Sequence, residues 1–298
     1  MAKKILTITL ALMIMLSMST VVTNVDANIQ NTEIVNTQQE SEIAKNSNEQ
    51  MTEVNDDIEN NVEDKVQIQT PNRGKVQYTI TEAPGPIEEK SHKRLIDPNK
   101  PMIAITYDDG PSKYTSEILN VLKENNSDAT FFVLGSRVND NKNILKQMLE
   151  EGNQIGNHSY NHKNLTTVSD EELYNQIKGT DDLVYMATGY TPSVMRPPYG
   201  STNEELNKKI LKPIIQWSID TRDWENRNTE IIINTILENV SDGDIILMHD
   251  IYESTAQASK IVIPELIKRG YQLVTIDELF EYKDVTFTAG EQYYKMFK

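Results

Sequence analysis

The chain has 298 residues, a formal net charge of −16 and no cysteine. That length is enough for one large domain or two medium ones, each with a substantial core. The lack of cysteine excludes disulfides, thiolate metal sites and cysteine nucleophiles. The acidic balance argues against nucleic acid as a partner, because binding phosphates requires basic patches.

The first 27 residues have the pattern of a secretory signal. Lys3 and Lys4 form a basic start, and an apolar run follows over residues 5–16. Residues 25–27 then offer small side chains at the positions that a signal peptidase reads. We therefore expect a secreted or cell-wall-associated protein. The alternative is an uncleaved anchor, because residues 5–23 approach the length that spans a bilayer. Only this segment would then contact a membrane.

Residues 28–73 are polar, with ten acidic and three basic side chains. Such a segment cannot bury enough apolar surface to offset the entropy lost on ordering. We expect a disordered spacer here, followed by a lead-in segment over 74–98. The main domain is expected over 99–282, with a tail over 283–298.

From residue 101 onward, short apolar runs alternate with amphipathic stretches. We expect strands at residues 102–107, 130–134, 154–156, 214–219, 244–248 and 272–275. We expect helices at residues 115–125, 142–151, 170–186, 203–211, 229–239 and 256–268. Alternating strands and helices predict an α/β fold with a mostly parallel sheet, either open or closed into a barrel.

Polar side chains follow several of the expected strands at their C-terminal ends. Asp108 and Asp109 follow the first strand, His158 the third, Asp220 the fourth and His249 the fifth. In a (β/α) barrel, sites are built at this rim because side chains from several strands converge there. Carboxylates and imidazoles together bind divalent metals and transfer protons near neutral pH. The sequence therefore predicts a metal-dependent hydrolase.

Each of these segments also has an ordinary structural interpretation. Asp108-Asp109-Gly110-Pro111 is typical of a turn, and His249 of a histidine at the edge of a core. His158 and His162, four residues apart, can face one ion but can also lie in a polar surface stretch. With a carboxylate they form a two-histidine, one-carboxylate set that leaves coordination positions open for water.

In chain order, the segments TYDDG, HSYNH, RPPYG, DTRDW and LMH resemble the five motifs of the NodB-homology polysaccharide deacetylases, carbohydrate esterase family 4. The resemblance extends over about residues 99–282. It implies a distorted (β/α) barrel. One visible variation is Tyr107, where many members have Phe. The spacer and the tail have no counterpart in the family core.

The resemblance implies a role for each residue of the motifs. Asp109, His158 and His162 would hold a divalent ion, most often zinc, with Co²⁺, Mn²⁺ and Ni²⁺ as other candidates. Asp108 would be the general base, oriented by Arg196. His249 would be the general acid, held in its proton-donating form by Asp220. The backbone N–H of Tyr199 would donate to the oxyanion, and a pocket for the acetyl methyl group would be lined by Trp224 and Leu247.

The expected activity is removal of N-acetyl groups from a GlcNAc-containing polysaccharide, with peptidoglycan as the polymer. The export signal and the long spacer suit a wall substrate. Two alternatives remain within enzymes, namely O-deacetylation of acetylated xylan and deacetylation of chitin. A third alternative is a wall-binding module without turnover, which the complete set of acid, base and metal ligands disfavours.

Overall fold

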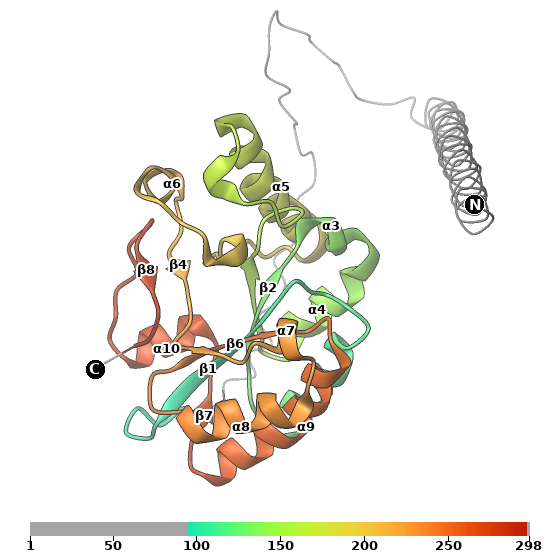
Figure 1. Ribbon diagram of the computed structural model, residues 1–298, viewed down its shortest axis with the longest axis vertical. Coiled ribbons are helices and arrows are strands. Elements are labelled where there is room, and N and C mark those ends of the chain that lie inside the picture. Colours follow the sequence, from blue (N-terminus) through green and yellow to red (C-terminus); the bar gives the residue numbers. More distant parts are fainter. Residues whose placement is uncertain (1–93, 297–298) are drawn as a thin grey trace, which may run out of the picture. The chain divides into compact units, whose positions relative to one another are not determined.

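The structure is a computed structural model that describes residues 94–296, and Figure 1 shows this part of the chain. All of these residues belong to one structural unit. The predicted signal or anchor segment, the spacer and most of the lead-in segment lie outside the described residues. Over 94–296, no helix combines the length and the apolar character needed to cross a membrane.

A parallel sheet with the strand order β3-β2-β1-β6-β5 lies at the centre of the fold (Figure 1). A short strand, β7, pairs with the start of β1. Because every pair in this sheet is parallel, the carboxyl ends of its strands meet at one edge. The strands are β1 (Met102–Asp108), β2 (Thr130–Val133), β3 (Gln154–Asn157), β5 (Ile219–Asp220), β6 (Ile245–His249) and β7 (Gln272–Leu273).

The sheet continues toward a distorted barrel through single bridges. Met195 bridges Asn157 at the end of β3 and Ile214 at the start of β4 (Ile214–Ile215). β4 pairs with β8 (Gln292–Tyr293), and Lys295 bridges back to Asp244 just before β6. Isolated bridges replace full strands along this side, which accounts for the distortion.

β1 is buried along its whole length, as the continuous apolar run predicts for a strand covered on both faces. Ile103, Ile105 and Tyr107 pack in one core cluster, between the sheet and the outer helices. Met102 and Ala104 pack in a second cluster, on the opposite face. This alternation follows from the two-residue period of a strand.

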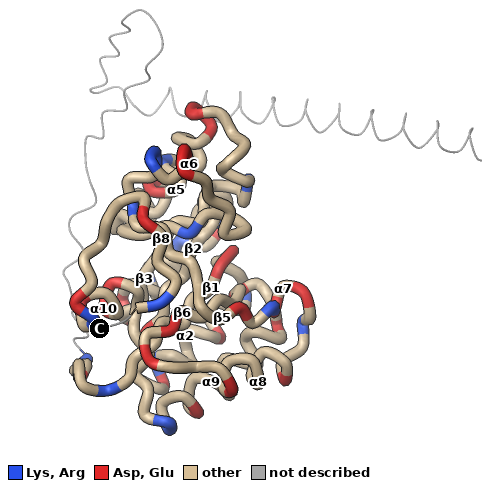
Figure 2. Tube along the Cα trace, turned by 60° about the vertical axis from the view of Figure 1, so that its left-hand side comes forward, with Lys and Arg blue, Asp and Glu red and all other residues tan. Residues whose placement is uncertain are grey.

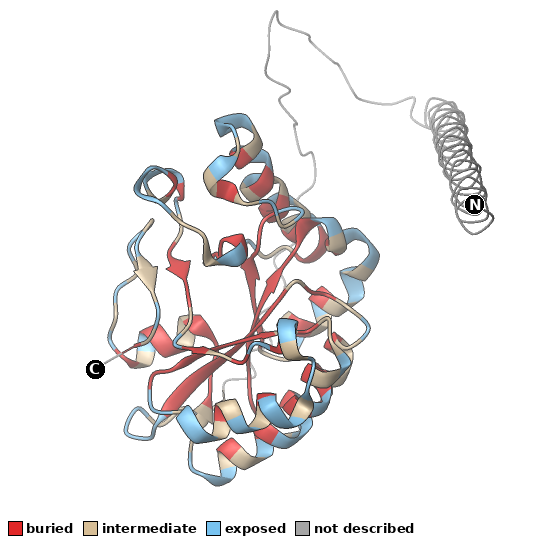
Figure 3. Ribbon diagram, viewed as in Figure 1, coloured by how far each residue is buried: buried red, intermediate tan, exposed pale blue. Residues whose placement is uncertain are grey.

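Nine α-helices and three short 3-10 helices lie in the described part of the chain. Figure 3 shows the strands of the central sheet largely buried and the outward faces of the helices exposed, and Figure 2 shows charges of both signs spread over these outer surfaces. The helices are α2 (Thr115–Glu124), α3 (Gly135–Val138), α4 (Lys142–Glu150), α5 (Asp170–Thr188), α6 (Glu204–Lys209), α7 (Asp223–Asn226), α8 (Thr229–Asn239), α9 (Glu253–Lys268) and α10 (Ile276–Tyr282).

The single strand predicted over 214–219 is wrong, because the structure divides it into β4 and β5. Two backbone carbonyls at the division accept hydrogen bonds from a buried guanidinium. The carbonyl of Ile215 accepts from Arg196 Nε at 2.9 Å, and that of Gln216 accepts from Arg196 Nη2 at 2.9 Å. The carbonyl of Gln216 therefore serves a side chain instead of continuing a strand ladder.

The predicted boundary at residue 282 also differs from the structure. The Phe287 ring stacks on Phe280 of α10 with centroids 3.7 Å apart, and Tyr293 of β8 lies edge-on to Phe280 at 4.8 Å. Met296 is buried in the core cluster on that face. The described residues of the predicted tail therefore belong to the domain.

Candidate metal and catalytic site

Asp109, His158 and His162 lie together beyond the carboxyl ends of β1 and β3. One ligand atom of each lies within 4.8 Å of the others. Asp109 Oδ1 is 3.5 Å from His158 Nε2 and 3.4 Å from His162 Nε2. This oxygen is buried and has no hydrogen-bond partner among the described residues, which is costly for a carboxylate unless a cation faces it. The three side chains therefore fit a metal ion.

The two imidazoles are oriented to present Nε2 to this point. His158 Nδ1 donates to the backbone carbonyl of Arg196 at 2.7 Å. A carbonyl can only accept, so Nδ1 carries the proton and Nε2 offers its lone pair. Burial and the neighbouring His158 lower the pKa of His162, which favours the neutral form that binds metals.

The backbone at this edge is held in an uncommon conformation. Asp109, Ser159 and His162 have φ angles of 72°, 70° and 63°, in the left-handed region that non-glycine residues rarely adopt. Tyr199 has a φ of 62°, and its ring lies edge-on to His162 with centroids 4.5 Å apart. Strained residues of this kind cluster at functional sites, where the surrounding structure imposes them.

Asp108 lies beside the three ligands and is anchored from behind by Arg196. Arg196 is fully buried, and its Nη1 donates to Asp108 Oδ1 at 2.7 Å and to Thr106 Oγ1 at 2.8 Å. The guanidinium also lies 4.2 Å from the ring centroid of Phe132. The other oxygen of Asp108 is 3.6 Å from His158 Nε2. The predicted orientation of Asp108 by Arg196 is therefore present.

The carboxylate that holds His249 is Asp223, so the assignment of this role to Asp220 is wrong. His249 Nδ1 donates to Asp223 Oδ1 at 2.8 Å, and the His249 backbone N–H donates to Oδ2 at 2.7 Å. Asp220 instead accepts from the backbone N–H of Arg222 at 2.8 Å. Arg222 has a φ of 52° and turns the chain into α7, which places Asp223 against β6.

Asp223 is itself fixed by Thr255, a residue that the sequence analysis missed. Thr255 lies on the buried face of α9 and donates from Oγ1 to Asp223 Oδ2 at 2.6 Å. Asp223 is completely buried, so both of its oxygens depend on these partners. In the sequence, the one indication of this role is a hydroxyl on the buried face of an expected helix, and a threonine at such a position is also common without any role in a site.

The surroundings of His249 favour its protonated form. Burial lowers the pKa of this imidazole, but the hydrogen bond to Asp223 and the negative charges of Asp223, Asp108 and Asp109 outweigh burial and raise the pKa to about 9. The contact with Asp223 therefore favours the imidazolium form of His249 at neutral pH. Its register partner on β1 is Asp108, so an acid and a carboxylate end neighbouring strands.

The two residues predicted to line an acetyl-methyl pocket are placed at the same edge. Leu247 is buried on β6, two positions before His249. Trp224 lies in α7 next to Asp223 and is 44% exposed. Tyr199, at 67%, is more exposed still. The methyl-binding role of Leu247 and Trp224 stays a prediction.

Residues 96–212 match a family model described as polysaccharide deacetylase. A peptidoglycan-N-acetylglucosamine deacetylase of Bacillus cereus is 39% identical over 194 residues, which cover 62% of this chain and 91% of that one. The peptidoglycan-N-acetylglucosamine deacetylase PgdA of Listeria monocytogenes is 48% identical over 193 residues, 64% of this chain and 41% of that protein. The chain thus spans about two fifths of the length of this Listeria relative.

Solved structures agree with these similarities. Peptidoglycan deacetylase PdaC of Bacillus subtilis is 44% identical with a TM-score of 0.63, over 63% of this chain and 94% of that one. A family 4 acetyl xylan esterase of Clostridium thermocellum, in complex with a cobalt ion, is 33% identical with a TM-score of 0.63, over 65% of this chain and 98% of that one.

Proposed function

Because the chain belongs to the polysaccharide deacetylase family, we propose that it hydrolyses N-acetyl groups of a GlcNAc-containing polysaccharide, with peptidoglycan as the polymer. The observation that carries this proposal is the position of Asp109 Oδ1, buried without a partner between His158 and His162. Asp108 and the protonated His249 end the neighbouring strands, so a base and an acid flank one point.

A divalent ion held by Asp109, His158 and His162 would polarise the acetamide carbonyl and lower the pKa of a water molecule. We propose zinc, because two imidazoles and one carboxylate with open positions suit it. Cobalt is the ion named with the xylan esterase relative, and manganese and nickel are the other candidates. Metal analysis of purified protein, followed by reconstitution of the stripped protein with each ion, tests this choice.

Two residues of the chain would carry out the proton transfers. Asp108, held by Arg196, takes a proton from the attacking water, and the backbone N–H of Tyr199 donates to the oxyanion of the tetrahedral intermediate. His249 protonates the departing amine, which is otherwise a poor leaving group. Asp223 keeps the proton on His249 until that step. Trp224 and Leu247 would enclose the acetyl methyl group.

We propose that the domain acts outside the cytoplasm, in secreted or wall-associated form, on the strength of the predicted signal at residues 1–27. An uncleaved anchor with an extracellular catalytic domain is the other outcome of this expectation. N-terminal sequencing of protein recovered from culture medium and from membranes separates the two.

Acetate release from peptidoglycan, N-acetylated chitooligomers and acetylated xylan tests the activity, with and without a chelator. We expect release from the glucosamine polymers, abolished by the chelator and restored by zinc. Asp108→Asn should retain metal and lose most of the activity. Release from xylan alone would indicate the O-deacetylase. Binding to walls without release from any polymer, unchanged in Asp108→Asn, would indicate a binding module.

A further inference from the structure

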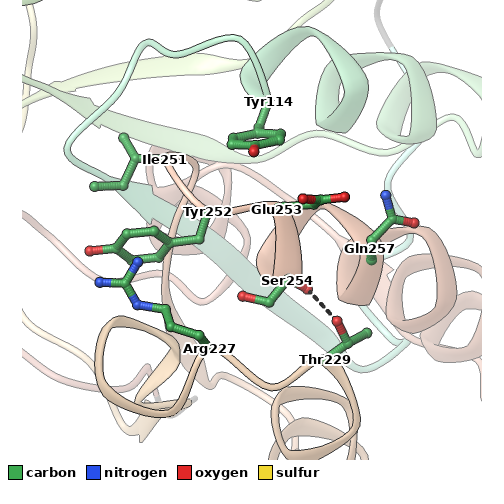
Figure 4. A pocket seen from close by; sticks show the side chains of 8 residues that line it. All are labelled: Tyr114, Arg227, Thr229, Ile251, Tyr252, Glu253, Ser254 and Gln257. Atoms are coloured by element: carbon green, nitrogen blue, oxygen red, sulfur yellow. Dashed lines mark hydrogen bonds between the residues drawn. The ribbon is translucent and has the colours of Figure 1, made fainter.

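Asp250 is a completely buried carboxyl group that the proposed proton transfers do not use. It directly follows His249, and the register partner of His249 is the residue before Asp109. Asp109 and Asp250 therefore leave the paired strands β1 and β6 at neighbouring points. The two segments that follow stay close, since Tyr114 from the first and Tyr252 from the second line one pocket (Figure 4).

Asp250 contacts the segment after Asp109 at three points. Its backbone carbonyl accepts a hydrogen bond from Ser112 Oγ at 2.5 Å, and its carboxylate Oδ2 accepts from Thr115 Oγ1 at 2.5 Å. The third point is Gly110, where a β-carbon would overlap the carboxylate of Asp250, so this close approach requires glycine. One aspartate thus holds the whole turn that follows the proposed metal ligand.

The hydroxyl of Thr115 joins this turn to the carboxylate. Its Oγ1 accepts from the backbone N–H of Ser112 at 2.8 Å and donates to Asp250 Oδ2. Thr115 is fully buried at the start of α2. The contacts support the chain directly after Asp109, whose φ of 72° persists only where the surrounding structure imposes it.

The Asp250 carboxyl group is costly to bury at this position. Its Oδ1 is buried and has no hydrogen-bond partner among the described residues. An apolar side chain of similar volume would avoid the cost of an unsatisfied polar atom. Polar groups that are kept at the expense of stability are expected mainly at functional sites. Packing alone therefore does not account for an aspartate at position 250.

We propose that Asp250 is a positioning residue, which acts through Gly110 and Thr115 to hold Asp109 in place for the metal ion. This inference rests on the proposed function, because it takes Asp109 as a ligand. Its effect should appear in metal affinity, since a ligand that is already held in place loses less entropy on binding. Partners that orient metal ligands typically change affinity or activity by about 10–100-fold.

The test measures the zinc affinity of the full chain by competition with a chromophoric chelator, which requires no activity. Thr115→Val removes the hydrogen bond to Asp250 with little change of shape, and Asp250→Ala removes the carboxylate. Both should bind zinc about tenfold or more weakly. Thr115→Ser keeps the hydroxyl and should restore the affinity of the wild type. Asp250→Asn keeps an oxygen for Thr115 and should lose less than Asp250→Ala.

Urea unfolding of the metal-free protein separates positioning from stability. Thr188→Val is the matched control, because Thr188 is buried on α5 and its Oγ1 donates to the Val184 carbonyl at 2.7 Å. Thr188→Val and Thr115→Val should both lower the free energy of unfolding. Only Thr115→Val should weaken zinc binding.

The outcomes distinguish this inference from the proposed function. If Thr115→Val binds zinc as tightly as the wild type, or if Thr115→Ser binds it as weakly as Thr115→Val, the inference is wrong, even where Asp250→Ala fails to fold. If the affinities differ as expected but the wild type releases no acetate from any glucosamine polymer, the proposed function fails and the role of Asp250 stands. If the wild type binds no zinc, both fail.

Discussion

His249 Nδ1 lies 2.8 Å from Asp223 Oδ1, and the backbone N–H of the same histidine lies 2.7 Å from Asp223 Oδ2. One carboxylate thus fixes both the ring and the main chain of the proposed general acid. The ring contact directs the Nδ1–H group of His249 at Asp223, because a carboxylate oxygen can only accept. The reactive Nε2 is left free to face the substrate.

Asp223→Asn should lower kcat/KM by roughly 10²–10⁴-fold, the range typical of a general acid or base. An amide cannot stabilise the imidazolium by charge, and it can also present a donor to Nδ1. Asp220→Asn is the matched control, since the hydrogen bond of the Asp220 carboxylate among the described residues is with the backbone N–H of Arg222 and not with His249. A larger loss in Asp220→Asn than in Asp223→Asn would contradict the assignment.

The pH dependence should report the same pair. His249 acts as an acid only when protonated, so kcat/KM in the wild type should fall as pH rises through about 9. Removing the Asp223 charge removes an effect that raises this pKa, so the alkaline limb of Asp223→Asn should move to lower pH. The relative loss should therefore be greater at pH 8.5 than at pH 6. A limb that stays at the wild-type position would exclude His249 as its source.

Thr255→Val should reduce activity although Thr255 touches no substrate. The change removes the hydroxyl that donates to Asp223 Oδ2, and a buried carboxylate that loses a donor costs about 1–3 kcal/mol. We expect a lower kcat, because Asp223 loses a contact that positions it against His249. Thr255→Ser keeps the hydroxyl and should restore kcat. Equal losses in Val and Ser variants would assign Thr255 to packing alone.

Arg196→Met should lower the free energy of unfolding of the domain. Breaking a buried ion pair typically costs about 3–5 kcal/mol, because the remaining charge is left uncompensated. Arg196 is fully buried, and it serves Asp108, Thr106 and two backbone carbonyls. Urea unfolding measures the loss. Arg222→Met is the control, since its ion pair with Glu225 is exposed and should contribute under about 1 kcal/mol.

Asp109→Ala should lower the affinity for the metal ion as well as the activity. Partners that merely orient metal ligands typically change affinity by about 10–100-fold, and we expect a larger loss for a ligand itself. Metal content after dialysis and the rise in melting temperature with added zinc measure the loss without an activity assay. Asp220→Ala should keep both readouts. Unchanged metal content in Asp109→Ala would exclude Asp109 from the ligands.

The position of the site could be predicted from the sequence because its polar residues lie at the ends of expected strands. Asp108, Asp109 and His249 end or follow apolar strands, His158 follows the short strand β3, and parallel strands bring such ends together. The position of a residue after a strand does not show whether Asp220 or Asp223 holds His249. Both lie within four residues of a strand end, and the left-handed φ of 52° at Arg222, which turns the chain so that Asp223 meets His249, is not predictable from the residue type.

The sequence also left the closing side of the barrel unpredicted. Met195 joins β3 to β4 through single bridges, which leave no run of alternating residues to detect. The division between β4 and β5 depends on Arg196, nearly twenty residues earlier in the chain. A tail was expected over 283–298 because this segment has no counterpart in the family core, although several of its described residues are partly or fully buried.

Phe287→Ala tests whether that last segment belongs to the folded unit. Its ring stacks on Phe280 at 3.7 Å and lies edge-on to Tyr293 at 6.1 Å. Removing a buried phenylalanine ring costs about 3–5 kcal/mol, and the half-buried Phe287 should cost about 1–3 kcal/mol in urea unfolding. Tyr294→Ala is the matched control, since that side chain is 52% exposed. Equal, small effects of both changes would mean that the segment contributes nothing to the stability of the domain.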